Sequence, residues 1–230
     1  MRSGLVARIK NKFIKPENKV KLIRFGLLSG VTFNINLSYQ AQLYFGLWER
    51  ETLEFVRLFS RDIATAIDIG AGEGEYALYF IQKTLASTII ICEPSDSSRS
   101  MLEKNIKLNN PLRECKLNFI KDFINNSNVE GNRTLDSMLD IISFPCLIKI
   151  DTDGKELDIL KGANSLLANP GSRFIIETHS RELEDNCISL LQSYGFTTKI
   201  IRNAWWRLFI PEQRPIPHNR WLVAIKQLTI

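Results

Sequence analysis

A stretch of alternating glycines and carboxylates in the first half of the chain has the residue types of a ligand site. Residues 66–76 read AIDIGAGEGEY: an acid ends an apolar run, three glycines alternate, and a helical pattern begins. Glycine lets the backbone turn sharply and leaves no Cβ between the chain and a ligand. A strand, a glycine loop and a helix in this order predict a nucleotide-type site at the carboxyl edge of a parallel sheet. The residues expected around the ligand are Asp68, Gly70, Gly72, Glu73, Gly74 and Tyr76.

The spacing of the glycines and the charge beside them indicate the kind of ligand. A dinucleotide fingerprint reads G-x-G-x-x-G and places a pyrophosphate on the helix N-terminus. Here the glycines read G-x-G-x-G and Glu75 follows them, so a diphosphate would be repelled. A ligand with an adenosine, an ammonium group and no phosphate fits better, and S-adenosylmethionine is such a ligand. Asp68 and Glu73 are then expected to face its cationic methionyl end, and a tight turn without a ligand is the alternative.

A second acid follows the next predicted strand. Residues 87–95 read STIIICEPS, an apolar run that ends at Glu93. Glu93 lies roughly 20 residues beyond the glycine loop, the distance at which an acid meets a ribose diol in such folds. Its two carboxylate oxygens suit two hydroxyl donors. The alternative, a solvated loop acid, is disfavoured because the two motifs occur in this order.

Four segments of the chain carry a family resemblance. In order they read AIDIGAGEGEY, IICEPS, LIKIDTDGKELDILKGA and FIIETHS, within residues 44–201. Together they resemble the FkbM family of S-adenosylmethionine-dependent methyltransferases. The resemblance implies O-methylation of a hydroxyl on a sugar, glycolipid or small metabolite. The family usually has Asn where this chain has Glu73 and Glu where it has Asp153, which leaves a scaffold that binds the methyl donor without turnover as an alternative.

The elements that position these residues alternate between apolar strands and amphipathic helices. Strands are predicted at 63–69, 87–95, 115–121, 144–150 and 174–176, and helices at 51–60, 97–109, 134–142, 156–167 and 183–191, with a loop at 125–133. The last two strands, 196–201 and 221–226, are joined by a short, proline-containing segment, which predicts an antiparallel hairpin. The sequence therefore predicts an α/β, Rossmann-like class I methyltransferase fold. Its seven-stranded sheet would be mostly parallel, with a C-terminal antiparallel hairpin and helices on both faces.

Further acids end the later predicted strands, and ligands of an open α/β sheet bind outside that edge. Asp122 is a candidate for the acid that accepts the adenine amino group in methyltransferase folds, with a turn role as the alternative. Asp151 follows the fourth strand, and Glu177 and His179 follow the fifth. Together with Asp153, these three residues are expected on the substrate side, and Asp151 is also expected to contact the cofactor.

Methyl transfer to oxygen needs an aligned hydroxyl and an acceptor for its proton. His179 is the best general-base candidate because the unperturbed pKa of histidine lies near neutral pH. Asp151 is the alternative base, or it orients the hydroxyl. Lys149 either lowers the pKa of the acceptor or pairs with an acid. Asp151, Glu177 and His179 also resemble a hard-metal site, so Mg²⁺ is a less favoured alternative.

The basic residues of the chain are concentrated at its beginning. The 230 residues carry a net charge of +5, and residues 1–24 contain eight bases and one acid. We predict a basic N-terminal arm or helical extension over residues 1–42 and a catalytic domain over residues 43–230. Apolar residues among the first bases allow an amphipathic helix that packs on the domain, contacts an anionic membrane or binds RNA. RNA binding would favour the alternative of an RNA methyltransferase.

The remaining composition bounds the class of protein. No apolar run approaches the ~20 residues that a membrane span requires. The four cysteines are isolated and form no C-x-x-C pair, which indicates reduced thiols. These features predict a cytoplasmic protein, peripheral at the membrane if the basic arm binds lipid.

Overall fold

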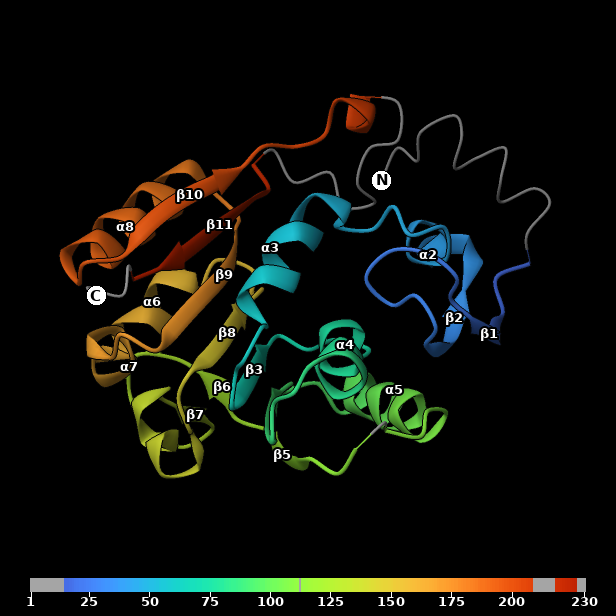
Figure 1. Ribbon diagram of the computed structural model, residues 1–230, viewed down its shortest axis with the longest axis horizontal. Helices are drawn as coiled ribbons and strands as arrows, with labels where there is room; N and C mark the ends of the chain where they lie inside the picture. Colours follow the sequence, from blue (N-terminus) through green and yellow to red (C-terminus); the bar gives the residue numbers. More distant parts are fainter. Residues whose placement is uncertain (1–14, 112, 209–217, 227–230) are drawn as a thin grey trace.

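A seven-stranded β-sheet forms the centre of the computed structural model, which describes residues 15–111, 113–208 and 218–226 (Figure 1). Its strands are β3 (Thr65–Ile69), β4 (Thr88–Cys92), β5 (Lys116–Ile120), β8 (Cys146–Ile150), β9 (Ser172–Thr178), β10 (Thr197–Ile201) and β11 (Arg220–Ile225). They lie in the order β10-β11-β9-β8-β3-β4-β5. Among these strands β11 alone runs in the direction opposite to the other six. The mostly parallel sheet and the C-terminal hairpin confirm the predicted fold.

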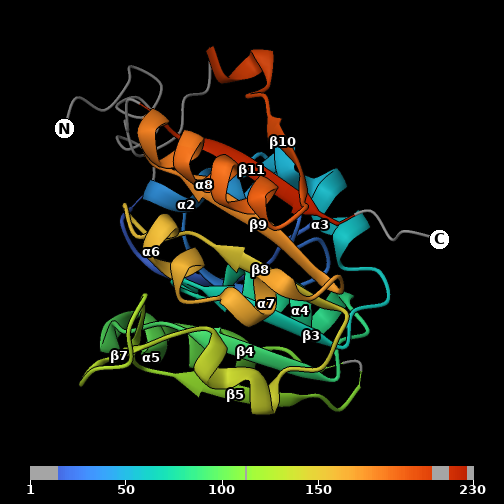
Figure 2. The ribbon, with the colours of Figure 1, turned by 90° about the vertical axis from the view of Figure 1, so that its left-hand side faces the viewer.

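Helices cover both faces of the sheet (Figure 2). One face carries α3 (Leu53–Phe59), α4 (Glu75–Lys83) and α5 (Asp96–Lys107); the other carries η2 (Asp136–Ile141), α6 (Glu156–Lys161), α7 (Asn164–Ala168) and α8 (Arg181–Ser193). Strand β4 shows the alternation that serves both layers. Ile89 and Ile91 pack with α4, whereas Ile90 packs with the second helical layer. The continuous apolar runs of the sequence therefore correspond to strands buried on both faces.

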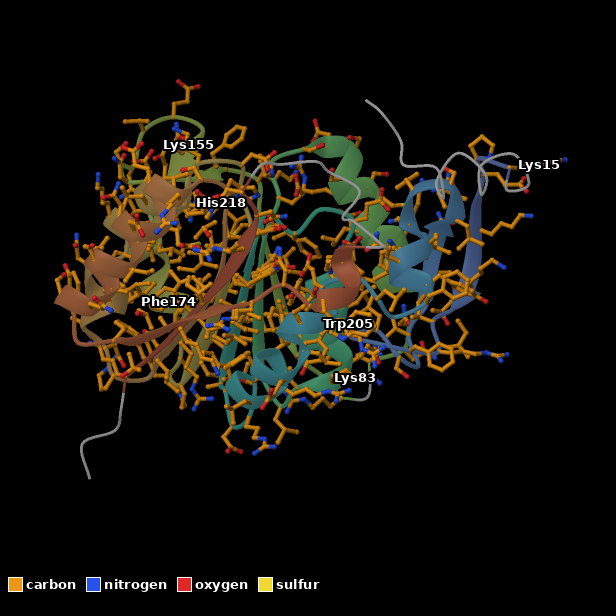
Figure 3. The ribbon with its side chains drawn as sticks, turned by 90° about the horizontal axis from the view of Figure 1, so that it is seen from above. Lys15, Lys83, Lys155, Phe174, Trp205 and His218 are labelled. Atoms are coloured by element: carbon orange, nitrogen blue, oxygen red, sulfur yellow. The ribbon has the colours of Figure 1, made fainter. Side chains whose placement is uncertain are left out.

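An N-terminal unit lies beside the first helical layer. It consists of β1 (Asn18–Leu22), β2 (Thr32–Asn36) and α2 (Leu37–Tyr44), and β1 pairs antiparallel with β2. The free edge of β2 is bound by α5, since Asn105 Oδ1 accepts a hydrogen bond from the Asn34 amide at 2.9 Å. Figure 3 shows the beginning of this unit, at Lys15, and Phe174 of the sheet toward opposite ends of the molecule. Phe33 is fully buried in the core shared with α4, so the described part of the predicted arm packs on the first helical layer.

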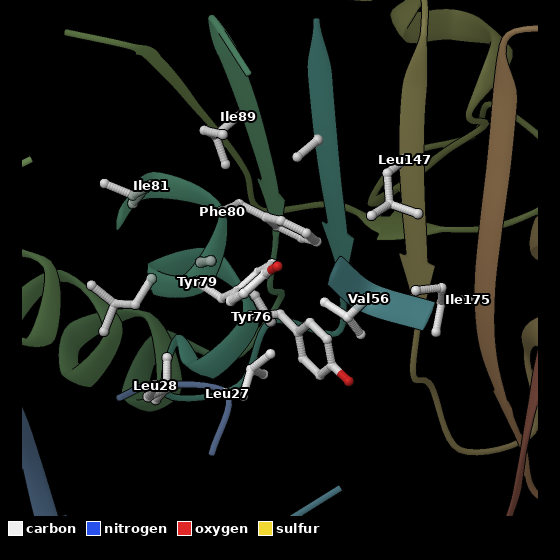
Figure 4. Close-up of a cluster of buried hydrophobic side chains, with 14 of the residues drawn as sticks. Leu27, Leu28, Val56, Tyr76, Tyr79, Phe80, Ile81, Ile89, Leu147 and Ile175 are labelled. Carbon is white, nitrogen blue, oxygen red and sulfur yellow. The ribbon is translucent and has the colours of Figure 1, made fainter. Parts of the chain in front are cut away.

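Aromatic side chains of α4 anchor the helix to the sheet (Figure 4). Tyr76, Tyr79 and Phe80 are buried in a cluster that includes Ile89 and Leu147 from two strands. The rings of Tyr76 and Phe80 lie 6.1 Å apart, within the range of favourable aromatic contacts. Burial of each large apolar side chain contributes about 1.5–3 kcal/mol, so the N-terminus of α4 is held firmly beside the glycine loop.

The prediction of one continuous helix over residues 156–167 is wrong. It divides into α6 and α7 at Gly162. A Cβ at Gly162 would lie 2.3 Å from the carbonyl oxygen of Asn125, so only glycine allows the close approach of another loop at this point. The helix predicted at 134–142 is the 3₁₀ helix η2.

The remaining short elements flank the predicted loops. β6 (Phe123–Ile124) and β7 (Asn132–Arg133) pair in parallel around the loop predicted at 125–133, and η1 (Arg50–Thr52) and η3 (Trp205–Leu208) are single turns. The predicted amphipathic stretch within residues 1–14 lies outside the described residues. Within the described ranges, no helix has the length and apolar character needed to cross a bilayer.

Candidate functional site

The glycine loop between β3 and α4 requires glycine for a specific reason. Gly70 has φ +74°, and a Cβ there would lie 1.9 Å from the carbonyl oxygen of Asp151. Gly72 has φ +54°, but a Cβ added at this position would have Glu75 Oε2 as its nearest neighbour, at 3.8 Å. Glycine at position 70 therefore allows the loop to contact the chain that follows β8. At position 72 it leaves the backbone open toward a ligand.

Gly70→Ala is expected to destabilise the fold by about 2–4 kcal/mol, because the new Cβ adds a backbone clash to a strained φ. Gly131→Ala is the matched control, since Gly131 has φ +75° and no atom within 4 Å of a Cβ. Urea unfolding of both variants separates the clash from the φ strain. Equal losses of stability in the two variants would show that the contact with Asp151 is unimportant.

Glu93 closes the loop from the neighbouring strand. Its Oε2 accepts the Gly72 amide hydrogen bond at 2.8 Å, and its Oε1 accepts that of Ser95 at 2.9 Å. The side chain is nearly buried and borders a cleft. Each carboxylate oxygen retains a second lone pair, so Glu93 can still accept hydrogen bonds from a diol.

A buried lysine links the ends of β3 and β8. Lys149 Nζ lies 3.3 Å from Asp68 Oδ1 and 3.5 Å from Asp151 Oδ2, and it donates to the Gly70 carbonyl at 3.1 Å. Burial alone would lower the pKa of Lys149, but Asp68 and Asp151 outweigh it and raise the pKa. Burial raises the pKa of Asp68, and Lys149 opposes that shift. Asp68, predicted to face the methionyl end of the ligand, is fully buried, pairs with Lys149 and does not line the cleft described below.

A cleft of about 470 Å³ opens above these strand ends. Six carboxylates line it: Glu49, Glu73, Glu75, Glu93, Asp151 and Asp153. Lys149 is the one basic residue among the described residues that line it. Such an excess of negative charge favours a cationic ligand.

The wall of the cleft at the start of α4 combines two acids with the N-terminal unit. Gln40 of α2 donates to Glu73 Oε2 at 2.9 Å, so α2 fixes the acid that replaces the family's asparagine. Burial raises the pKa of Glu75 to about 7, and the charge of Glu73 adds to that shift. Two other residues that line the cleft also contact each other: the Tyr76 hydroxyl donates a hydrogen bond to Glu49 Oε2 at 2.7 Å. Burial, followed by the Glu49 charge, raises the pKa of Tyr76 well above its usual range.

The substrate side contains an acid–histidine group. His179 Nδ1 bonds to Glu156 Oε1, while His179 Nε2 lies 3.4 Å from Asp153 Oδ1 and 3.8 Å from Asp151 Oδ1. Burial lowers the pKa of His179, but the hydrogen bond to Glu156 and the charges of Glu156, Asp151 and Asp153 together outweigh burial and raise it. Burial and then the neighbouring Asp151 carboxylate raise the pKa of Glu177, which stays protonated at neutral pH.

Asp151, Glu177 and His179 also form the group with possible metal-ligand geometry. One ligand atom from each lies within 4.8 Å of the others. A magnesium ion bound there would have to share Asp151 with Lys149, whose Nζ is 3.5 Å away. This competition makes the cluster a poorer cation site than its residue types suggest.

The structure brings most of the predicted cofactor residues to the cleft. Those that line it are Gly70, Gly72, Glu73, Tyr76, Glu93 and Asp151. Three predicted residues do not: Asp68 is buried beneath the loop, Gly74 packs against Leu102 of α5, and Asp122 pairs with Arg133 at 3.1 Å. The sequence did not identify Gln40, Glu49 or Glu156 as site residues. Glu156 is five positions beyond Asp151 in the resembling segment, the one signal that pointed toward it.

Comparison with known families agrees with this geometry. The profile of the Methyltransferase FkbM domain matches residues 61–203, which contain the glycine loop, Glu93 and the acid–histidine group. The comparison with curated protein sequences finds no match.

Solved structures show the same fold at low sequence identity. The FkbM methyltransferase from Methylobacillus flagellatus is 18% identical, with a TM-score of 0.54, and the match covers 80% of this chain and 53% of that one. The chain thus spans about half the length of that relative. M. jannaschii TYW2, solved in complex with AdoMet, has a TM-score of 0.51 at 14% identity, covering 91% of this chain and 85% of that one. A ribosomal protein L11 methylase from Lactobacillus delbrueckii has a TM-score of 0.50 at 16% identity, and the match covers 78% of this chain and 80% of that one.

Proposed function

Because the chain belongs to the FkbM family of S-adenosylmethionine-dependent methyltransferases, we propose that it methylates a hydroxyl of an uncharged acceptor, such as a sugar, glycolipid or small metabolite. The observation that supports this acceptor class is the acidic cleft, where six carboxylates surround one lysine among the described residues. Phosphates of a nucleic acid would be repelled there, whereas a cationic methyl donor and a neutral hydroxyl would not.

The residues at the glycine loop fit S-adenosylmethionine. Glu93 has lone pairs left for the two ribose hydroxyls, and the backbone at Gly72 is open, since a Cβ there would approach no described atom more closely than Glu75 Oε2 at 3.8 Å. Glu73 supplies negative charge for the amino group of the methionyl end, and Glu75, with a pKa of about 7, adds to it in its ionised form. When bound, S-adenosylmethionine supplies a methyl group on a positively charged sulfur.

The residues at the ends of β8 and β9 are proposed to handle the acceptor. As the acceptor oxygen forms its new bond to carbon, its proton passes to Nε2 of His179 in the unprotonated form of the ring. Asp151 orients the hydroxyl, and protonated Glu177 supports Asp151 through their hydrogen bond. Lys149 Nζ pairs with Asp151 Oδ2 at 3.5 Å and holds that side chain in place.

A basic surface favours a second candidate partner. Lys15, Lys19 and Arg24 are exposed at the beginning of the described chain. They would attract an anionic membrane, or RNA as the acceptor of an RNA methyltransferase. The variant Lys15→Glu/Lys19→Glu should bind anionic vesicles or RNA more weakly at low salt, and whichever of the two ligands loses affinity is identified as the partner.

Glu93→Gln is expected to weaken binding of S-adenosylmethionine by about 10- to 100-fold, because the amide loses charge-assisted hydrogen bonds to the ribose and to the loop. Isothermal titration calorimetry measures the affinity. Glu103→Gln, on the exposed side of α5, should bind as the wild type does. An unchanged affinity in Glu93→Gln would remove Glu93 from the cofactor site.

The proposed function is tested by titration with S-adenosylmethionine followed by a screen of glycan, lipid and RNA acceptors for methyl transfer. Transfer to a hydroxyl of an uncharged acceptor supports the proposal. Transfer to RNA alone supports the second candidate, and tight binding without transfer to any acceptor supports a non-catalytic scaffold. Turnover that EDTA abolishes and Mg²⁺ restores would assign Asp151, Glu177 and His179 to a metal.

A further inference from the structure

Glu156 is a buried acid that joins two loops at the carboxyl edge of the sheet. It is the first residue of α6, after β8, and its side chain is fully buried. Its Oε1 bonds to Nδ1 of His179, which follows β9, and also accepts the Gly154 amide hydrogen bond at 3.2 Å. The carboxylate therefore fixes one nitrogen of an imidazole whose other nitrogen is directed toward the cleft side.

The second nitrogen of His179 is left without a hydrogen bond within the described part of the chain. Nε2 is buried and has no hydrogen-bond partner there, although Asp153 Oδ1 is 3.4 Å away and Asp151 Oδ1 is 3.8 Å away. A carboxylate accepts and does not donate, so Nδ1 must carry the proton between His179 and Glu156. In the neutral ring Nε2 then presents its lone pair beside Asp151.

We infer that Glu156 is a positioning residue: it holds His179 in the tautomer and orientation in which Nε2 takes the proton of the acceptor hydroxyl. The inference rests on the proposed function, which makes His179 the base. The proton moves from the acceptor oxygen to Nε2, and the proton on Nδ1 stays in the hydrogen bond to Glu156. Through that bond, Glu156 also stabilises the positive charge that the ring then carries.

The carboxylate of a purely structural pair would be satisfied more completely. The histidines do not make this distinction, because Nε2 of His218, like that of His179, is buried without a hydrogen-bond partner in the described part of the chain. The other buried glutamate–histidine pair supplies the comparison: Glu184 binds Arg220 through both oxygens and lies 3.3 Å from His218 Nε2. Among the described residues Glu156 has no such cation, and its Oε2 has no hydrogen-bond partner. A buried carboxylate left this poorly solvated costs stability, which is typical of groups retained for a functional arrangement.

The kinetic test compares Glu156→Gln with Glu184→Gln. The amide of Glu156→Gln can donate to Nδ1 and so favour the wrong tautomer. We expect its kcat to fall by about 10- to 1000-fold with an unchanged affinity for S-adenosylmethionine. Glu184→Gln should keep its kcat within about two-fold, although it breaks a buried ion pair. An unchanged kcat in folded Glu156→Gln would overturn the inference.

A spectroscopic test is independent of turnover. The chain has two histidines, so ¹⁵N-resolved imidazole spectra can assign both rings. The spectra are recorded at a pH at which both rings are neutral, so that each carries a single N–H proton. In the wild type, His179 should be protonated on Nδ1, and Glu156→Gln should shift the population toward Nε2 without changing the His218 signals. Protonation of wild-type His179 on Nε2 would overturn the inference while leaving the proposed activity untouched. The expected tautomer in a protein that transfers no methyl group would instead count against the proposed function.

Discussion

Lys149→Met is expected to lower the free energy of unfolding by about 3–5 kcal/mol, because it removes one partner of a buried charge group and leaves the other partners uncompensated. Methionine preserves most of the length of the side chain but carries no charge. Asp68 and Asp151 lie 3.3 and 3.5 Å from Nζ, and Asp68 is fully buried. The same change removes the hydrogen bond to the Gly70 carbonyl and the contact over the Tyr76 ring at 5.0 Å.

The expected loss depends on pH in a defined direction. Burial already raises the pKa of Asp68, and Lys149 opposes that rise. Without Lys149 the folded-state pKa of Asp68 rises further, so folding favours the protonated acid. The variant is therefore least destabilised near pH 4 and loses stability as pH rises toward the folded-state pKa. Urea unfolding between pH 5 and pH 8 measures this trend.

Two variants control the experiment. Lys199→Met removes an exposed lysine that also lies over an aromatic ring, that of Phe55 at 4.8 Å, and should cost less than about 1 kcal/mol. The double variant Asp68→Asn/Lys149→Met removes both buried charges and should recover part of the loss. A double variant less stable than Lys149→Met alone would show that the charge of Asp68 is not what Lys149 compensates.

The sheet could be predicted from the sequence because its signals are local. Each strand is a short β-branched run, and the acids Glu93 and Asp151 directly follow their strands, which places them at one edge whatever the details of packing. The antiparallel hairpin followed from the length and the prolines of one connection. These features require no knowledge of which side chains touch.

The exceptions depend on contacts between distant segments. Gly162 looks in the sequence like a tolerated glycine in a helix, but the close approach of Asn125 requires glycine at this position, where α6 and α7 divide. Asp68 has the sequence position of a ligand contact, but its burial follows from Lys149 on the next strand, in register at Asp68–Lys149. Asp122 pairs with Arg133 of β7 at 3.1 Å and does not line the cleft.

The same reason explains which site residues the sequence missed. Gln40 reaches Glu73 across 33 positions, and Glu49 reaches Tyr76 across 27. Neither pair has a motif, because each is created by the packing of the segments before β3 against α4. The charge of the cleft is likewise a sum over several loops. The cofactor end of the site could therefore be predicted from motifs, whereas the walls that select the ligand could not.

His179→Gln is expected to lower kcat by about 10²–10⁴-fold, the usual contribution of a positioned general base. Glutamine keeps a polar side chain of similar reach, but its amide does not take up a proton near neutral pH. Affinity for S-adenosylmethionine should be unchanged, since His179 is on the acceptor side and does not line the described cofactor wall. Single-turnover methyl transfer with the acceptor found in the screen measures the effect on chemistry directly.

The control for this prediction is the second histidine. His218 Nε2 lies 3.3 Å from Glu184, which also binds Arg220 of β11. This group does not line the cleft, so His218→Gln should retain transfer within about two-fold. Equal kcat values in His179→Gln and the wild type would move the base role to Asp151, the alternative base, whose Oδ1 lies 3.8 Å from Nε2 in the wild type. Loss of transfer in both variants would indicate instead that this edge of the sheet fails to hold its shape. The pair of variants thus separates the chemistry of the imidazole from the packing that surrounds it.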